Sequence, residues 1–363
     1  MKAGILGLPS VGKTTLFNLL TRGHAEVRKF GGGGEPNLGV TSVPDPRLDW
    51  LAGVYAPKKT TPATVDFVEV AGVAPGATKE RGFSPTLLTA LRGVDALLHV
   101  VRAFDDPSVP HSEGSVNPAR DAESLELELA FADFAQIDKR LAVIENDRAK
   151  RRNFDKAVSE KEHPLLQRLK AHLESELPLR TLALTDDEQT TLRGYTFLSQ
   201  KPLILIVNTG EAAIGQPLPA EVSAFAARQQ LATLSLCAQI ELEIAQLDDA
   251  DAATFLADLG IAEPARDRLI RMAYATLDLV SFFTVGPDEC RAWTLARGDT
   301  ALQAAGKIHS DLARGFIRAE IIAYQRLREC GSWNAAKAKA HLRLEGKAYL
   351  MQDGDCMSVR FSV

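Results

Sequence analysis

The residues best suited to chemistry lie near the amino terminus, in the run Gly7-Leu8-Pro9-Ser10-Val11-Gly12-Lys13-Thr14. A short apolar run precedes it, and residues with apolar side chains at helical spacing follow it. The pattern GxxxxGK[ST] between a strand and a helix is typical of a phosphate-binding loop. Gly7 and Gly12 let the backbone curl so that its N–H groups point at phosphate oxygens. The run therefore predicts a site for a nucleoside triphosphate.

Two side chains of this loop have distinct expected roles. Lys13 supplies a positive charge for the β and γ phosphates, and the Thr14 hydroxyl is placed to hold Mg²⁺. The amino-terminal end of the following helix adds its positive dipole. The alternative is a glycine turn beside a surface lysine. The expected nucleotide-binding residues of this segment are Leu8, Pro9, Ser10, Val11, Gly12, Lys13, Thr14 and Thr15.

A carboxylate that steers Mg²⁺ is expected at the end of a second strand, usually within the pattern DxxG. The corresponding run here is Glu69-Val70-Ala71-Gly72, which follows the strand-like segment 65–70. Glu69 is therefore the second expected metal ligand, one methylene longer than the usual aspartate. Gly72 is expected to offer its N–H to the γ-phosphate. The next residue, Val73, is apolar and cannot orient a water molecule.

The base is usually recognised by an NKxD pattern after a later strand. At that place stands Asn208-Thr209-Gly210-Glu211. Thr209 replaces the lysine, and Glu211 is poorly placed to accept the two donors of guanine. Asn208 can offer a donor and an acceptor to adenine, which favours adenine or weak discrimination over strict choice of guanine. The alternative is an ordinary loop after a strand. Cys237 and Ala238, after the strand-like segment 231–236, complete the expected nucleotide-binding set.

The composition is that of an ordinary globular protein, with 45% hydrophobic and 25% charged residues. A length of 363 residues predicts two or three domains. The net charge of −5 argues against a nucleic-acid-binding role for the whole surface. The four cysteines form no CxxC pair, so a zinc site or a disulfide framework is not expected. No signal peptide or membrane-spanning run is found, and we expect a soluble cytoplasmic protein, with a monomer favoured and no membrane partner.

Strand-like and helix-like segments alternate at first, which predicts an α/β fold with a mostly parallel sheet. Segment 65–70, the helix 85–92 and segment 96–101 belong to this pattern. Apolar residues at steps of three or four then predict two antiparallel helices around a polar turn. Strands are expected to resume at 202–207 and 231–236, followed by helices at 244–259 and 265–279. The expected division is 1–120 with 200–280 for the nucleotide domain, 121–199 for the helical insertion and 281–363 for a small α+β module.

Taken together, these residues resemble the Obg-like ATPase family known as YchF, within the phosphate-loop translation-factor class. The resemblance runs nearly from end to end. It includes runs beyond the nucleotide motifs: Glu35-Pro36-Asn37-Leu38-Gly39-Val40, Val43-Pro44-Asp45-Pro46-Arg47-Leu48, Val100-Val101-Arg102-Ala103-Phe104, Gly114-Ser115-Val116-Asn117-Pro118, Ala304-Ala305-Gly306-Lys307-Ile308-His309-Ser310-Asp311 and Arg343-Leu344-Glu345-Gly346-Lys347.

The resemblance implies a P-loop nucleotide domain, an inserted helical hairpin and a carboxyl-terminal TGS domain with a β-grasp fold. It also implies a preference for ATP over GTP, association with ribosomes or ribosomal RNA, and slow intrinsic hydrolysis. A loop histidine of that family has been proposed to position the attacking water, and the corresponding residue here is His111. His111 and Lys13 are thus the expected catalytic residues.

Three departures from the family pattern fall on hydrolysis and switching. No Ser or Thr occurs between His24 and Val40, and Gly33 stands where the family has a threonine. Glu69 replaces an aspartate, while Glu80 and Ser84 replace glycines of the second switch. We expect a slow Mg²⁺-dependent ATPase acting as a ribosome-associated switch. The alternatives are a nucleotide-gated binding module with little or no hydrolysis, and a GTPase of the related Obg class.

Overall fold

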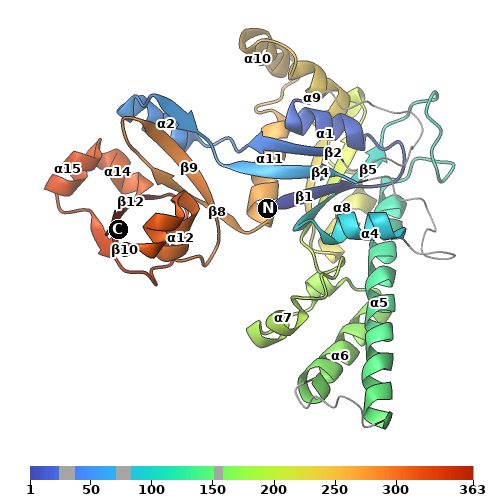
Figure 1. Ribbon diagram of the computed structural model, residues 1–363. Coiled ribbons are helices and arrows are strands. Elements are labelled where there is room, and N and C mark those ends of the chain that lie inside the picture. Colours follow the sequence, from blue (N-terminus) through green and yellow to red (C-terminus); the bar gives the residue numbers. More distant parts are fainter. Residues whose placement is uncertain (24–36, 71–82, 151–157, 363) are drawn as a thin grey trace. The chain divides into compact units, whose positions relative to one another are not determined.

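The computed structural model describes residues 1–23, 37–70, 83–150 and 158–362. These residues form two compact units (Figure 1). The first unit contains Met1–Gly39 and Asp66–Arg266, and the second contains Val40–Val65 and Asp267–Val363. Among the described residues, no helix is both long and apolar enough to cross a membrane.

The first unit is built on a six-stranded sheet with the strand order β2-β4-β1-β5-β6-β7. β1 pairs in parallel with β4 and with β5, and the pairs β5–β6 and β6–β7 are also parallel. The predicted α/β class with a mostly parallel sheet is confirmed. The strands are β1 (Lys2–Leu6), β2 (Asn37–Ser42), β4 (Thr64–Glu69), β5 (Ala96–Ala103), β6 (Leu203–Thr209) and β7 (Ala232–Leu236).

Helix α4 of this unit begins where the sequence supplies a capping group. The Ser84 side chain accepts a hydrogen bond from the Leu87 N–H, and Pro85 follows it at the start of α4, the helix predicted at 85–92. Leu97 of β5, Leu125 of α5 and Phe225 of α8 pack in one buried cluster beside the sheet. The bounds of the helices in this unit are α1 (Lys13–Thr21), α4 (Pro85–Arg92), α5 (Pro118–Lys150), α6 (His163–Glu174), α7 (Asp186–Leu192), α8 (Ala220–Arg228), α9 (Ala238–Ile244) and α10 (Asp249–Asp258).

The long helix α5 and the shorter α6 form the expected helical insertion (Figure 1). Their shared core consists of leucine and isoleucine side chains at helical spacing. Two buried polar contacts hold α5 against the chain that follows α6. Arg180 binds the Glu126 carboxylate at 2.7 Å, and the Asp133 carboxylate accepts hydrogen bonds from the backbone of Leu198 and Ser199. Burial raises the pKa of Asp133 to about 6.

The second unit contains a mixed sheet with the order β11-β10-β12-β8-β9-β3. β8 and β9 form an antiparallel hairpin, and β12 pairs with β8 in parallel. Alanines of α12 pack on the sheet beside Phe282 and Phe316. The elements are α2 (Pro46–Tyr55), β3 (Lys59–Thr61), β8 (Leu279–Thr284), β9 (Glu289–Ala296), α12 (Ala301–Ile308), α13 (Ser310–Arg314), β10 (Phe316–Ala323), α14 (Tyr324–Cys330), α15 (Trp333–Ala338), β11 (Arg343–Glu345) and β12 (Asp355–Phe361).

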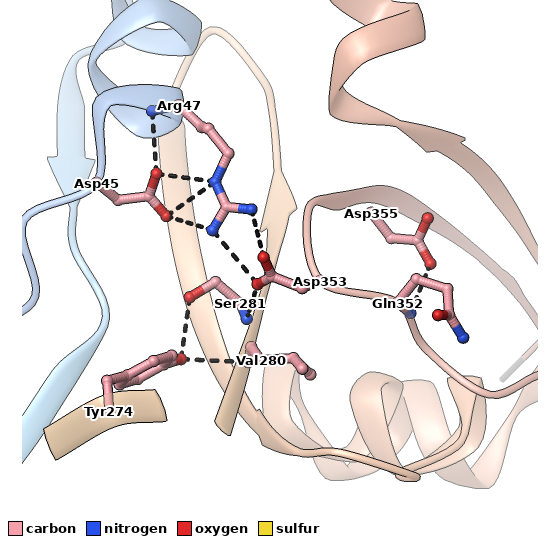
Figure 2. Close-up of polar contacts among 8 residues, drawn as sticks. All are labelled: Asp45, Arg47, Tyr274, Val280, Ser281, Gln352, Asp353 and Asp355. Atoms are coloured by element: carbon pink, nitrogen blue, oxygen red, sulfur yellow. Dashed lines mark hydrogen bonds and ion pairs between the residues drawn. The ribbon is translucent and has the colours of Figure 1, made fainter. Parts of the chain in front are cut away.

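Residues 40–65 belong to the second unit, which differs from the predicted division. β3 pairs in parallel with β9, and the amino-terminal end of α2 is bound by a network of charges. Figure 2 shows Arg47 between two carboxylates: it contacts Asp45 at 2.8 Å and Asp353 at 2.7 Å. Asp353 also accepts a hydrogen bond from the Ser281 N–H at 2.9 Å. The partners of residues 40–65 lie more than 200 residues away in the sequence. A division into consecutive segments therefore assigns residues 40–65 to the wrong unit.

Other boundaries also differ from the predicted ones. The second part of this unit starts within α11 (Ala265–Thr276), so residues 267–280 join it instead of the nucleotide domain. The helix expected at 244–259 is interrupted, because Asp248 caps α10 with its side chain. Likewise, His309 has extended backbone angles and its Nδ1 accepts a hydrogen bond from the Asp311 N–H. His309 therefore separates α12 from α13.

Candidate functional site

The loop between β1 and α1 has the curled backbone that its glycines permit. Gly7 and Gly12 have φ angles of 154° and 96°, which side-chain-bearing residues rarely adopt. A Cβ atom on Gly7 would lie 2.3 Å from the Val100 carbonyl oxygen, and one on Gly12 would lie 2.3 Å from Asn208 Nδ2. Both positions therefore require glycine for packing as well as for conformation.

Lys13 is folded back onto the loop that precedes it. Its Nζ donates to the Leu8 carbonyl at 2.7 Å and to the Gly7 carbonyl at 3.2 Å. Only 8% of Lys13 is exposed. Burial lowers the pKa of Lys13 to about 8, and the nearby Glu69 carboxylate opposes this shift. The ammonium group thus has carbonyl partners but lacks full compensation of its charge, which phosphate oxygens at this loop would provide.

The other residues expected to bind the nucleotide differ in their burial. Leu8 and Val11 are buried and fix the loop to the core, whereas Pro9 and Ser10 are partly exposed. Ser10 has a positive φ of 60°. Thr15 lies in the first turn of α1 and is partly buried.

The two expected metal ligands are adjacent. The Thr14 hydroxyl donates to Glu69 Oε1, and the Asn37 amide donates to Glu69 Oε2 at 2.7 Å. Register places Glu69 opposite Ile5, at the carboxyl end of β1 where the loop starts. Hydroxyl and carboxylate oxygens suit Mg²⁺, which takes one or two protein ligands together with phosphate oxygens. Within the described ranges, no cluster of three or more His, Cys, Asp or Glu could hold a metal by itself.

The Asn208 amide has protein partners that differ from the expected contact with adenine. Its Nδ2 donates to the Val11 carbonyl at 2.9 Å, and its Oδ1 accepts from the Ala238 N–H at 3.0 Å. The side chain is buried and connects the phosphate loop to the start of α9. It therefore positions the loop, since its polar atoms are directed at backbone groups of both segments.

The remaining residues expected near the base surround this connection. The Thr209 hydroxyl is buried without a hydrogen-bond partner among the described residues. Glu211 is exposed and begins the short 3-10 helix Glu211–Ala213. Cys237 is buried directly before α9. Gly72 lies outside the described residues, as do Gly33, Val73 and Glu80.

His111 lies in the loop between β5 and α5, and both of its ring nitrogens face protein groups. Nδ1 accepts a hydrogen bond from the Glu113 N–H at 3.1 Å. Nε2 lies 3.0 Å from Asp121 Oδ2, although neither of these two atoms has a hydrogen-bond partner of good geometry. Because Nδ1 accepts, the neutral ring carries its proton on Nε2. In this arrangement the ring has no free acceptor for a water molecule.

Two positioning residues were missed by sequence reasoning. Asn37 belongs to the run 35–40, whose residue types alone do not indicate its contact with Glu69. Arg102 of β5 is buried, and its guanidinium donates to the carbonyls of Phe104, Asp106 and Val109, which organises the loop before His111. A charged residue at the end of an otherwise apolar strand was the available signal, because such a residue needs buried partners.

The parallel sheet, the glycine loop with its lysine and threonine, and the carboxylate at the end of β4 define the class of P-loop NTPase folds. A family model described as "50S ribosome-binding GTPase" matches residues 2–146, and the model YchF-GTPase_C, described as "Protein of unknown function (DUF933)", matches residues 279–362. The chain is 41% identical to the ribosome-binding ATPase YchF of Bacillus subtilis, covering 100% of both chains. The chain therefore belongs to the YchF family.

Two further relatives agree with this assignment. The ribosome-binding ATPase YchF of Escherichia coli O157:H7 is 40% identical over 100% of this chain and 99% of its own. The solved structure of the Schizosaccharomyces pombe YchF GTPase has a TM-score of 0.85 and 28% identity, and the match covers 99% of this chain and 97% of that chain. The predicted resemblance is confirmed.

Proposed function

We propose that this protein binds ATP with Mg²⁺ at the loop Gly7–Thr14 and hydrolyses it slowly to ADP and phosphate. The observation that carries the proposal is the convergence of Lys13, Thr14 and Glu69 at one end of β1 and β4. Curled backbone N–H groups bind the phosphates, and the Lys13 ammonium compensates the β and γ charges. Thr14 and Glu69 would hold Mg²⁺, which would supply positive charge to the triphosphate. GTP is the weaker nucleotide in this proposal.

Slow turnover follows from what the described residues already bind. The Thr14 hydroxyl is bonded to Glu69, so a metal must displace that contact. The His111 ring faces Glu113 and Asp121, and it must turn away from Asp121 before Nε2 can face a water molecule. Each rearrangement raises the barrier before the chemical step. If neither rearrangement occurs, the protein would bind the nucleotide without hydrolysing it, which is the alternative of a nucleotide-gated binding module.

Association with the ribosome is the second part of the proposal. It is supported by the names of the relatives from Bacillus subtilis and Escherichia coli O157:H7, which are ribosome-binding ATPases, and by the matched family model. Because nucleotide exchange changes the groups around Thr14 and Glu69, ribosome affinity is proposed to depend on the bound nucleotide. Such a protein acts as a switch in the cytoplasm.

Calorimetric titration with ATP and GTP, each with and without Mg²⁺, tests binding, and single-turnover phosphate release with excess protein tests hydrolysis. We expect ATP to bind more tightly than GTP and phosphate release to be slow. Lys13→Ala should abolish triphosphate binding, whereas Lys58→Ala, a matched change at an exposed lysine, should not. ATP binding without phosphate release favours the gated module, and tighter GTP binding favours the Obg-class alternative.

Ribosome association is measured by pelleting purified ribosomes with the protein in ATP, ADP or no nucleotide. We expect the pelleted fraction to differ between ATP and ADP. Lys13→Ala should remove that difference, because it removes triphosphate binding. Equal pelleting in all three conditions would contradict a nucleotide-dependent switch.

A further inference from the structure

The Glu69 carboxylate is held from both of its oxygens by different elements. Thr14 of α1 donates to Oε1, and Asn37, the first residue of β2, donates to Oε2 at 2.7 Å. The loop, β2 and the end of β4 are thus joined by one carboxylate. A glutamate has three side-chain torsions, so without the second contact its Oε1 could leave the threonine.

Asn37 is delivered to this place by a strand that packs against α1. A Cβ atom added to Gly39 would lie 2.3 Å from Thr21 Cγ2 and 3.1 Å from the Phe17 ring. The backbone of β2 therefore approaches α1 as closely as a glycine permits. Asn37 lies two residues before Gly39, and Thr14 lies on α1 with Phe17 and Thr21. The packing of Gly39 on α1 therefore limits the movement of Asn37 relative to Thr14.

The chemistry of the contact suits a group that orients a metal-binding carboxylate. An amide N–H donates to Oε2 without adding a charge, so the carboxylate keeps its full negative charge for a cation. We infer that Asn37 is a positioning residue for magnesium: its hydrogen bond to Oε2 would keep the Glu69 carboxylate beside Thr14 when Mg²⁺ displaces the direct contact between Oε1 and the Thr14 hydroxyl. The inference rests on the proposed nucleotide site and adds to it a residue of β2.

The test measures metal affinity separately from nucleotide affinity. Binding of ATP or ADP is titrated by calorimetry in EDTA and then at increasing Mg²⁺. Mn²⁺ binding to the protein–nucleotide complex is followed by electron paramagnetic resonance. In Asn37→Ala we expect the metal affinity of the complex to fall about tenfold. Nucleotide affinity in EDTA should remain that of the unchanged protein, because Asn37 acts only through Glu69.

Two further variants make the result specific. Gln136→Ala removes a carboxamide that is hydrogen-bonded to Arg92 and Tyr195 in the same unit, and we expect it to leave metal affinity unchanged. In a Glu69→Gln background, Asn37→Ala should produce no further loss of metal affinity, since the oriented charge is already gone.

The outcomes separate the inference from the proposed function. Unchanged metal affinity in Asn37→Ala overturns the inference, and so does an equal loss of nucleotide affinity in EDTA, which would show a general structural role. The inference is also overturned if the losses of metal affinity caused by Asn37→Ala and Glu69→Gln are fully additive in the double variant. Failure of the unchanged protein to bind any purine nucleotide contradicts the proposed function instead.

Discussion

His111 Nε2 lies 3.0 Å from Asp121 Oδ2, and the two side chains are only 4% and 1% exposed. Arg120 donates to the other oxygen, Asp121 Oδ1, at 2.7 Å. The histidine ring is therefore buried against a carboxylate at the start of α5, although the sequence places it in a surface-type loop. A buried pair of this kind holds the ring until one partner changes.

Asp121→Ala should release the His111 ring. The expected result is faster modification of His111 by diethyl pyrocarbonate, located by mass spectrometry, together with a severalfold rise in ATP turnover if ring release limits hydrolysis. His99, which is fully buried, serves as the unreactive internal reference. Asp138 lies on α5, as Asp121 does, and forms an ion pair with Lys170 of α6. Asp138→Ala removes that ion pair and should change neither measurement. An unchanged modification rate in Asp121→Ala would mean that the carboxylate does not hold the ring.

Lys13 should make triphosphate binding depend on pH. Its pKa is lowered to about 8 in the free protein, and bound phosphates raise it again, so binding takes up a proton above pH 8. The affinity should therefore fall by about tenfold for each pH unit above 8, until the pKa of the bound state is reached. Calorimetry at pH 9 in two buffers of different ionisation enthalpy measures this proton uptake. Identical heats in both buffers would contradict the prediction.

The length of the Glu69 side chain should limit turnover. Glu69→Asp withdraws the carboxylate by one methylene from Thr14, which frees the hydroxyl for a metal. We expect faster single-turnover phosphate release with little change in nucleotide affinity in EDTA. Glu221→Asp, the same shortening at an exposed glutamate of α8, is the control for the metal effect. No change in the rate would indicate that turnover is limited instead by Gly33, which stands where the family has a threonine.

Asn208 should contribute to stability as well as to binding. Asn208→Ala leaves the Val11 carbonyl and the Ala238 N–H buried without their partner. The expected loss in the free energy of unfolding is about 2 kcal/mol, measured by urea denaturation. Gln239→Ala removes only an exposed contact with Glu243, and it should cost less than about 0.5 kcal/mol. Equal losses in the two variants would show that Asn208 does not support the loop.

Arg47 should hold residues 40–65 within the second unit. Lysine cannot reproduce the contacts of the guanidinium with both Asp45 and Asp353, so Arg47→Lys is expected to cost about 2 kcal/mol in unfolding free energy. Lys58→Ala breaks an ion pair whose side chains are about four-fifths exposed, and it should cost well under 1 kcal/mol. Thermal unfolding of the two variants side by side measures the difference. Equal midpoints would contradict an anchoring role for Arg47.

Features encoded by neighbouring residues could be predicted from the sequence, and features made by distant residues could not. The phosphate loop is a contiguous run between a strand and a helix, and the Ser84-Pro85 helix start is equally local. The partners of Asn208 lie 197 and 30 residues away, so its positioning role was not visible. The inclusion of residues 40–65 in the second unit depends in the same way on a distant contact, because Arg47 and Asp353 lie 306 residues apart. Asn37 was missed for the same reason, because its partner Glu69 lies 32 residues away.

The pairing of β3 with β9 has a consequence for synthesis of the chain. Residues 59–61 leave the ribosome long before residues 289–291, which complete their edge of the sheet. At about 5–20 residues per second, that early segment must wait on the order of ten seconds or more for its partner. The second unit can therefore close only at the end of translation, and cutting the chain at residue 280 would leave both fragments with an unmatched strand.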